Sequence, residues 1–266
     1  MRHAFALGTL ALLVGCANHQ AQLGPLIAGH PGALQVYRTA GLPVQAWAPA
    51  GNHQRLRVFI EGDGYAWVTA SRPSLDPTPR QPTILQLALS QRDAGYLGRP
   101  CQYVSGDACK PLVWTDQRFS RQSLQAMAAA IDGLKLAAGA TKVELVGYSG
   151  GAAIALLLAA TRDDVVAVQT IAGNLSPRTW AQQQGHTGLA GALDPIDYSQ
   201  ALSGIPQRHL VAMGDTVVPR GSQDAYVASL APSSPVEVLR YQGNHWEGVA
   251  GAWAQFGALP LPESPR

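Results

Sequence analysis

Three side chains that lie far apart in the sequence have the chemistry of acyl transfer: Ser149, Asp215 and His245. A serine hydroxyl is a weak nucleophile at neutral pH, so it needs a neighbouring imidazole as a base and a carboxylate to orient that imidazole. Ser149 lies in the stretch Gly147-Tyr148-Ser149-Gly150-Gly151, directly between a β-type segment and an apolar, helix-type segment. The sequence therefore predicts a nucleophile on a sharp turn from strand to helix.

The glycines of this stretch have a steric purpose. A sharp turn holds the serine in a strained backbone conformation, and Gly147 and Gly151 let the strand and the helix approach each other. The N-terminus of the following helix then points at Ser149, where its positive end favours a developing negative charge.

Asp215 and His245 each follow a predicted strand, at 209–213 and 236–241. We expect His245 to open the last helix, which is predicted at 245–256. Both residues also have a purely structural alternative, since Gly-Asp is ordinary turn chemistry and a histidine can cap a helix.

Other residues are weaker candidates for the same roles. Asp194 and Asp197 are the alternative acids if Asp215 points away. His186 lies in a polar loop, and His209 begins a strand, at the end opposite the predicted site.

The Gly-x-Ser-x-Gly motif and the order serine, acid, histidine resemble the nucleophile elbow and triad of α/β-hydrolases. The stretch from Met213 to Pro219 is similar to the acid loop of that superfamily, with one spacer changed. The resemblance covers residues 56–256 and implies a three-layer α/β-hydrolase fold, with a mostly parallel central sheet flanked by helices. It also implies an acyl-serine intermediate, with Ser149, Asp215 and His245 as the triad and no metal or organic cofactor.

Two backbone amides are implied as donors to the oxyanion of this reaction. One belongs to Gly150 and the other to Asp63, with the amide of Gly64 as the alternative to Asp63. Glu61 departs from the superfamily, which often has a histidine at that position. Pairing with Arg118 and recognition of an amine are two roles for this acid, and a solvated carboxylate at a strand end is the expected one.

More narrowly, four segments resemble a group of uncharacterised proteobacterial α/β-hydrolases of exported or lipoprotein type: FIEGDG, PTPRQPT, residues 99–103 and residues 114–119. That group has no assigned substrate to transfer to this chain.

Segments of β type alternate with segments of helical periodicity along the chain. Strands are predicted at 44–48, 56–61, 96–104, 142–146, 165–172, 209–213 and 236–241, and helices at 83–92, 119–138, 150–160, 222–230 and 245–256. Such alternation predicts a mostly parallel sheet covered on both faces. A small insertion with the character of a partial lid is expected around 174–198.

The composition agrees with one packed domain. The chain has 266 residues, of which 47% are hydrophobic and 14% charged, with a formal net charge of +2. This balance argues against disorder and against a nucleic-acid partner. We find no repeat at a fixed period, which argues against solenoids and propellers.

The N-terminus has the pattern of a targeting segment. Arg2 and His3 precede an apolar run from Ala4 to Val14 that is too short to span a bilayer. The run leads into Leu-Val-Gly-Cys16, which resembles the lipobox of bacterial lipoproteins. The alternative is a plain secretory signal cut after Ala17.

The lipobox implies three parts of the chain: a signal peptide over 1–15, a tether over 16–35 that begins with a lipidated Cys16, and the α/β-hydrolase domain over 36–266. The expected location is the bacterial cell envelope. The residue after the cysteine is not an aspartate, which favours the outer membrane, facing the periplasm, in the enterobacterial pattern.

Of the three cysteines, Cys16 is assigned to the lipid, which leaves Cys101 and Cys109 as an even pair in a Pro- and Gly-rich stretch. An oxidising compartment favours a disulfide between them, and two free thiols are the alternative.

Together these features predict a serine hydrolase that cleaves an ester, thioester or amide of a small acyl substrate, with an ester favoured by analogy. A non-catalytic hydrolase-like lipoprotein that binds an envelope partner or lipid, and an acyltransferase with the same triad, are the alternatives. The sequence indicates no particular oligomeric state.

Overall fold

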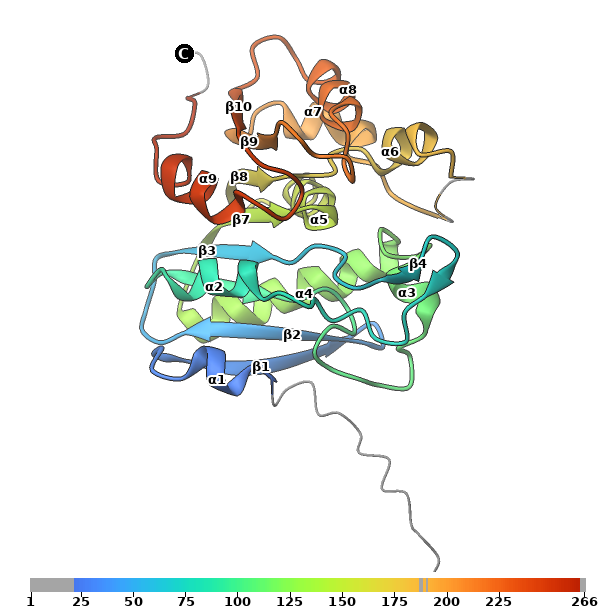
Figure 1. The fold of residues 1–266 in the computed structure, drawn as a ribbon. Helices are drawn as coiled ribbons and strands as arrows, with labels where there is room; N and C mark the ends of the chain where they lie inside the picture. The colour runs from blue at the N-terminus through green and yellow to red at the C-terminus, as the bar shows by residue number, and fades with distance from the viewer. Residues whose placement is uncertain (1–21, 187–188, 190, 264–266) are drawn as a thin grey trace, which may run out of the picture.

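The computed structural model describes residues 22–186, 189 and 191–263, and Figure 1 shows how they fold. The predicted signal peptide and Cys16 lie outside the described residues. The helices are α1 (Gly24–Ile27), α2 (Thr83–Leu89), α3 (Pro111–Trp114), α4 (Arg121–Ala138), α5 (Gly150–Ala159), α6 (Pro177–Gln183), the 3-10 helix η2 (Pro195–Tyr198), α7 (Ser199–Leu202), α8 (Gly221–Ser229) and α9 (Val249–Phe256). The strands are β1 (Gly32–Thr39), β2 (Leu42–Pro49), β3 (Arg55–Ile60), β4 (Trp67–Thr69), β5 (Arg72–Pro73), β6 (Ala94–Leu97), β7 (Lys142–Tyr148), β8 (Val165–Ile171), β9 (Gln207–Ala212) and β10 (Val236–Tyr241).

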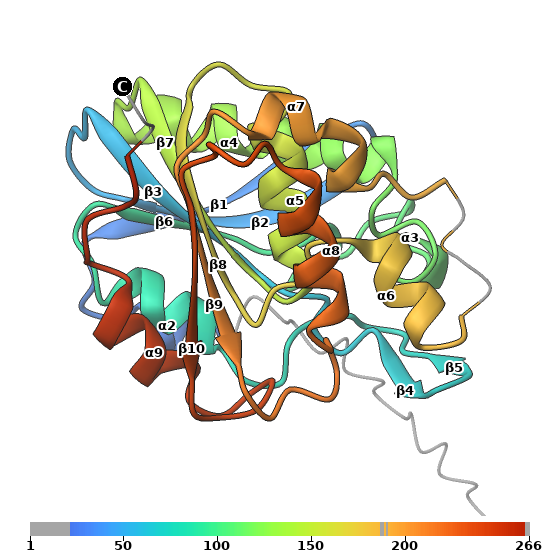
Figure 2. The same cartoon turned by 90° about the horizontal axis from the view of Figure 1, so that it is seen from above.

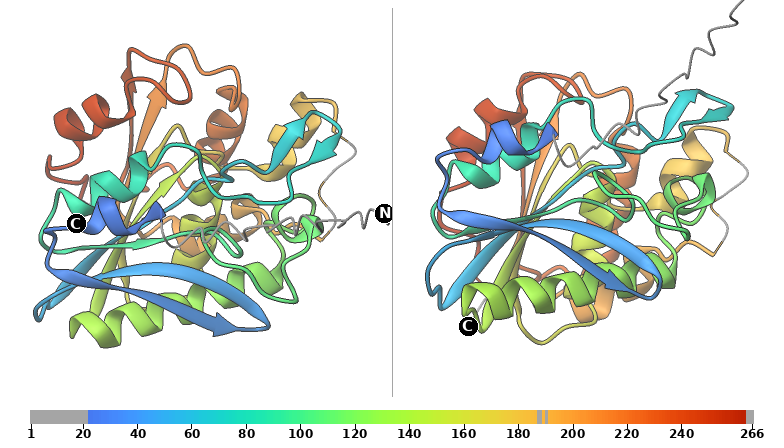
Figure 3. Two further views of the ribbon diagram at one scale, coloured as in Figure 1. Left: turned by 60° about the horizontal axis from the view of Figure 1, so that its bottom comes forward. Right: turned by 90° about the horizontal axis from the view of Figure 1, so that it is seen from below.

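Eight of these strands form one sheet in the order β1-β2-β6-β3-β7-β8-β9-β10. Neighbouring strands from β6 to β10 are parallel, whereas β2 runs antiparallel to both β1 and β6. Figures 2 and 3 show helices on both faces of the sheet, with α4 and α5 on one face and α1, α2 and α9 on the other. The mostly parallel, three-layer α/β architecture predicted from the sequence is confirmed.

The direction of the strands brings distant parts of the chain to one edge. β3, β7, β9 and β10 run the same way, so the loops that follow them all leave the sheet at the same side. These loops carry Asp63, Ser149, Asp215 and His245. Ligands of open α/β sheets bind at this carboxyl edge, where loops from several strands meet.

The helices beside the central strands follow from their sequences. All ten residues of α5 are buried, as its lack of a polar face predicts, because it packs against β7 and β8. α4 begins where the hydroxyl of Ser120 accepts a hydrogen bond from the backbone N–H of Ser123, and it ends at Gly139, which has a φ of 62°. A cap at each end agrees with the predicted helix at 119–138.

Two predicted elements have a boundary that is wrong by four residues or more. The strand predicted at 96–104 ends at Leu97, and the positive φ values of Cys101 and Tyr103, 70° and 60°, are outside the range of a regular strand. The last helix begins at Val249 rather than at 245, since Asn244 closes a turn by accepting hydrogen bonds from the backbone N–H groups of the residues two and three positions after it. His245 therefore lies in a loop.

The packed part of the chain begins ahead of residue 36, where the sequence predicts the start of the domain. β1 starts at Gly32, and Leu23 is fully buried in the core beside α2. Within the described ranges, no helix combines the length and the apolarity of a membrane-spanning segment.

Arg208 of β9 ties the end of the chain to the sheet. Its side chain is fully buried, and its guanidinium donates hydrogen bonds to the backbone carbonyls of Phe256, Leu259 and Pro260. It also donates to the carboxylate of Glu237 on β10, at 2.6 Å. The segment after α9 is thus held by contacts to a buried charge.

Cys101 and Cys109 form a disulfide, as the sequence predicts, with their Cα atoms 5.7 Å apart. The bond closes a short loop between β6 and α3, and the side chain of Cys101 is buried.

Replacement of both cysteines by alanine should lower the free energy of unfolding by about 2 to 3 kcal/mol, because the loop is no longer closed in the unfolded chain. Urea denaturation of the wild-type protein and the double variant measures this difference. The same comparison under a strong reductant is the control, since both proteins then lack the bond. Equal stability of the two proteins under oxidising conditions would contradict the prediction.

Candidate active site

Ser149 lies on the turn that joins β7 to α5. Its φ is 51°, in the left-handed region, which costs a residue with a side chain on the order of 1–3 kcal/mol. A Cβ atom at Gly147 would lie 2.5 Å from the Cα of Ala152, and one at Gly151 would lie 2.4 Å from the carbonyl oxygen of Glu61. Only glycine fits at these two positions.

The structure brings the serine, the histidine and the aspartate together. His245 Nε2 lies 2.9 Å from Ser149 Oγ, and His245 Nδ1 lies 2.8 Å from Asp215 Oδ2. The side chains of His245 and Asp215 are only 5% and 3% exposed, so water competes little for these bonds.

The carboxylate of Asp215 is oriented by the backbone. Its Oδ1 accepts hydrogen bonds from the N–H groups of Val217 and Val218, at 2.9 and 2.8 Å. The other oxygen remains for the imidazole of His245.

The two alternative acids bond elsewhere. Asp194 is buried, and its Oδ2 accepts hydrogen bonds from the hydroxyl of Ser176 and the N–H of Arg178, near the start of α6. Asp197 forms an ion pair with Arg178 at the surface. Neither carboxylate is bonded to His245.

The two weaker histidines also lie apart from Ser149. His186 stacks on the ring of Trp180, with the centroids 5.1 Å apart. His209 is fully buried in β9, with Nδ1 2.9 Å from Thr170 Oγ1, and this burial lowers its pKa to about 3. It therefore stays neutral in the folded protein.

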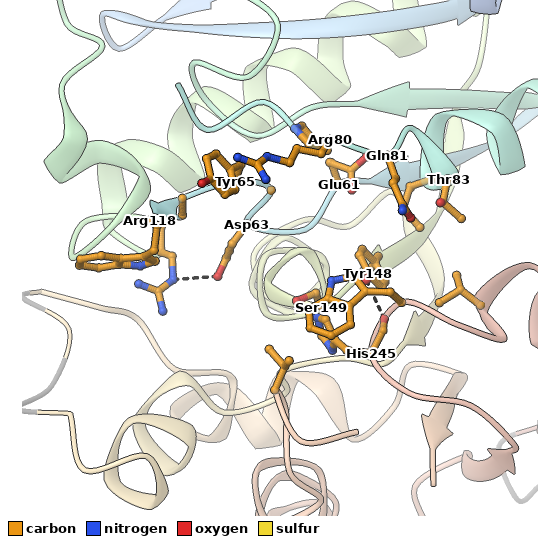
Figure 4. Close-up of a pocket in the computed structure, with 18 of the residues that line it drawn as sticks. Glu61, Asp63, Tyr65, Arg80, Gln81, Thr83, Arg118, Tyr148, Ser149 and His245 are labelled. Carbon is orange, nitrogen blue, oxygen red and sulfur yellow. Dashed lines mark hydrogen bonds and ion pairs between the residues drawn. The ribbon is translucent and has the colours of Figure 1, made fainter. Parts of the chain in front are cut away.

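Tyr148 holds the loop of His245 in place, which the sequence did not indicate. Its hydroxyl donates a 2.7 Å hydrogen bond to the backbone carbonyl of His245, drawn as a dashed line in Figure 4. Burial raises the pKa of this hydroxyl, so it keeps its proton. The Gly-x-Ser-x-Gly motif leaves the residue before the serine unspecified, so it does not predict a contact made by Tyr148.

The loop after β3 presses against the turn at Ser149. A Cβ atom at Gly62 would lie 3.1 Å from the Cβ of Ser149, and one at Gly150 would lie 2.0 Å from Oδ1 of Asp63. The carboxylate of Asp63 thus occupies the space that a side chain at position 150 would need. The two amides predicted as oxyanion donors belong to residues in direct contact.

Arg99 and Arg118 both form ion pairs with the carboxylate of Asp63, and this pairing was not predicted from the sequence. Their guanidinium groups lie 3.1 and 2.9 Å from its two carboxylate oxygens. Both arginines fall in segments noted for their resemblance to a group of exported or lipoprotein-type α/β-hydrolases, but the one partner considered for Arg118 in the sequence was Glu61, and none was considered for Arg99.

Glu61 differs from its sequence prediction. It was expected to be a solvated strand-end carboxylate, but it is only 2% exposed, and it does not pair with Arg118. Its Oε1 accepts a hydrogen bond from the N–H of Gly62, and its Oε2 accepts one from the hydroxyl of Tyr96 on β6. Burial raises the pKa of Glu61 to about 7, against the opposing effects of these two bonds and of the charge of Arg99.

A pocket of about 580 Å³ opens beside Ser149 (Figure 4). Aromatic and aliphatic side chains form much of its lining: Tyr65, Trp67, Ile84, Tyr148, Trp180, Val217, Trp246 and Val249. Polar and charged side chains complete it: Glu61, Asp63, Arg80, Gln81, Thr83, Arg118 and His245. α6, within the segment expected to be an insertion, contributes Trp180 to this wall, and the indole N–H of Trp180 donates to the carbonyl of Val217. A mostly apolar cavity with a few convergent polar groups is typical of a site for a small organic molecule.

Neither a scan of family models nor a search of curated proteins gave a match to this sequence. Solved structures are nevertheless similar in fold. An esterase from Pyrococcus furiosus has a TM-score of 0.63 and 11% identity, with 87% of this chain and 91% of that chain covered. A cold-adapted esterase from an Arctic intertidal metagenomic library has a TM-score of 0.58 and 16% identity, over 85% of this chain and 89% of that chain.

The acylaminoacyl peptidase of Pyrococcus horikoshii is also similar, with a TM-score of 0.62 and 12% identity. The match covers 93% of this chain but only 44% of the peptidase, so this chain spans less than half the length of that protein. At such low identities, the comparisons bear on the fold alone. Together with the order and direction of the strands, they show that the chain has the α/β-hydrolase fold.

Proposed function

We propose that the protein is a serine hydrolase that cleaves an ester, thioester or amide through an acyl-serine intermediate, with a carboxylesterase-type activity favoured. The observation that carries the proposal is the chain of hydrogen bonds from Asp215 through His245 to Ser149, at 2.8 and 2.9 Å, beside a pocket of about 580 Å³. The three groups are in the order and at the distances that nucleophilic catalysis needs.

In this proposal the neutral imidazole of His245 carries its proton on Nδ1, which donates to Asp215. Nε2 then accepts the proton of Ser149 as Oγ attacks the acyl carbon, and later returns it to the leaving group. The leaving group departs with that proton, and water repeats the sequence to release the acid and restore the serine. Asp215 stays ionised and stabilises the imidazolium.

The oxyanion would accept hydrogen bonds from the N–H groups of Gly150 and Asp63. Direct packing between these two residues, and the ion pairs that Asp63 makes with Arg99 and Arg118, keep the second amide in one place. Donors fixed before the reaction lose no free energy to reorganisation when the charge develops.

We also propose that Cys16 carries a lipid that holds the enzyme at the bacterial cell envelope, at the outer membrane in the enterobacterial pattern. The support is the sequence that ends the apolar run, Leu-Val-Gly-Cys. The disulfide between Cys101 and Cys109 agrees with an oxidising compartment.

Acyl transfer to an alcohol or amine uses the same groups, and a hydrolase-like scaffold that only binds an envelope partner is the non-catalytic alternative. The hydrogen bonds at Ser149 favour an enzyme over the scaffold. Product analysis with added alcohol or amine acceptors separates transfer from hydrolysis.

A fluorophosphonate probe should label the wild-type protein and leave Ser149→Ala unlabelled. Hydrolysis of p-nitrophenyl butyrate should fall about 1000-fold or more in this variant, since the nucleophile is lost. Ser233→Ala, which removes an exposed hydroxyl outside the pocket lining, is the matched control and should behave as wild type. If wild type and Ser149→Ala were equally unreactive, the enzyme proposal would fail and the binding scaffold would be favoured.

Glu61 should make stability depend on pH. In the folded protein its carboxyl holds a proton up to about pH 7, whereas in the unfolded chain it loses the proton near pH 4.5. The stability that this group contributes is therefore fully present below pH 4.5 and is lost as the pH rises through 7. Between pH 4.5 and 8 the free energy of unfolding of wild type should fall by about 3 kcal/mol relative to Glu61→Gln.

Urea denaturation of both proteins across this pH range measures the effect. Glu263→Gln, which changes an exposed glutamate, is the control and should track wild type. A difference between Glu61→Gln and wild type that does not change with pH would show that the carboxyl titrates normally.

Cys16→Ser should abolish lipidation. In a Gram-negative host that expresses the full-length chain, the wild-type protein should incorporate labelled palmitate and partition into the detergent phase of Triton X-114. The variant should do neither, since the thiol is the site of attachment. Absence of label from wild type would point to a plain secretory signal, and label in the variant would show that the lipid is attached at another residue; either result would contradict lipidation of Cys16.

A further inference from the structure

One wall of the pocket carries a buried cluster of three charges. Asp63 lies between Arg99 and Arg118, with nitrogen to oxygen distances of 3.1 and 2.9 Å. The two arginine side chains are only 5% and 6% exposed. One carboxylate is thus shared by two guanidinium groups, which leaves one positive charge without a matching anion in the cluster.

Other acids near the pocket neutralise this charge only in part, and the charge of Glu61 acts on Arg99. Glu61 is the second acid of the lining, and its oxygens bond to the N–H of Gly62 and the hydroxyl of Tyr96. Burial raises its pKa to about 7, so its charge is incomplete at neutral pH. Asp215 is bonded to His245. A buried charge of this kind is costly unless it meets an opposite charge.

The guanidinium of Arg118 has a nitrogen left for a ligand. Its Nη1 donates to the carbonyl of Thr115 at 2.7 Å, and its Nε faces Asp63. Among the described residues, Nη2 has no hydrogen-bond partner. The ring of Trp180, 5.3 Å from the guanidinium carbon, packs beside the group, and both side chains line the pocket.

Asp63 connects Arg118 to the turn that carries the predicted nucleophile. The carboxylate of Asp63 touches Gly150, the residue after Ser149, and Arg118 is one ion pair further on. Figure 4 shows Arg118 and Asp63 to one side of Ser149, with Thr83 to the other. Ser149 and Arg118 line the same pocket, so a substituent that extends from a carbonyl at Ser149 along this wall would reach the guanidinium.

A second cation lines the same pocket. Arg80 is exposed, and its guanidinium carbon lies 3.5 Å from the centre of the Tyr65 ring. Glu61 and Asp63 are the only acids of the lining within the described residues, and Asp63 is already shared between two arginines. The field in the cavity therefore favours negative ligands.

We propose that the pocket selects acyl substrates that carry a carboxylate a few bonds from the scissile carbonyl, and that Arg118 is the residue that recognises this carboxylate. The inference rests on the proposed hydrolase activity and gives it a substrate class. A guanidinium donates to a carboxylate through planar, charge-assisted hydrogen bonds, and Arg80 adds attraction at the rim. The apolar side chains of the lining hold the rest of the molecule.

Matched substrates test the inference. In the first series, p-nitrophenyl monoesters of succinate and glutarate are compared with p-nitrophenyl butyrate and valerate, so that the charge is in the acyl group. In the second, the butyrate ester of 4-hydroxybenzoate is compared with phenyl butyrate, so that the charge is in the leaving group. Wild type should prefer the charged member of at least one series by tenfold or more in kcat/KM. The series that shows this preference tells whether the recognised carboxylate belongs to the acyl group or to the leaving group.

Arg118→Gln should lower that preference by roughly 10- to 100-fold, as expected for a hydrogen bond between charged groups, chiefly by raising KM for the charged ester. Arg118→Lys should keep part of the preference, since it keeps the charge. Arg240→Gln, which removes an exposed arginine outside the pocket lining, is the control and should keep all of it. A preference that is unchanged in Arg118→Gln would overturn the inference.

A measurement on wild type alone covers the case in which the Arg118 variants do not fold. Glutarate should slow labelling of the protein by a fluorophosphonate, whereas its neutral diamide at the same concentration should not. Equal effects of the two compounds would overturn the inference. Absence of labelling and of turnover with every ester would instead reject the proposed hydrolase, so the two failures are distinguishable.

Discussion

Ser149 has a positive φ because β7 passes into α5 within a single residue, and the close contacts at this turn constrain what surrounds it. A Cβ atom at Gly151 would clash with the carbonyl of Glu61, so the loop after β3 must lie against the start of α5. Backbone packing, rather than flexible side chains, therefore sets the distance between the serine and this loop. Burial of α5 maintains the strained backbone of Ser149, because a relaxed turn would pull the apolar residues of this helix out of the core.

The polar groups around this turn are each held by a partner from another part of the fold. Tyr148 binds the backbone beside the imidazole, the acid loop orients Asp215, and two arginines from the segments after β6 hold Asp63. Such contacts keep donors and acceptors in place before any ligand arrives, which is the condition for electrostatic catalysis. They also make the site dependent on the whole sheet, since no single element contains it.

Asp215 and His245 could be located from the sequence because each closely follows a short predicted strand, and parallel strands end at one edge. The path of the chain around Cys101 could not be predicted, since Cys101 and Tyr103 have positive φ values that residues of these types rarely adopt. The burial of Glu61 depends on Tyr96, which lies on the neighbouring strand and 35 positions away. Local patterns thus predicted the elements and the three side chains that meet at Ser149, whereas pairings between distant polar residues required the folded chain.

Arg208 has a consequence for the order in which the molecule is completed. Its guanidinium is enclosed by β9, Glu237 and the backbone carbonyls that follow α9, so those carbonyls solvate a charge that water does not reach. A nascent chain that stops at Phe256 lacks two of these acceptors. The enclosure of this arginine is therefore complete only when the chain has been synthesised through Pro260, and a fusion partner has to be joined beyond Pro260 rather than directly after α9.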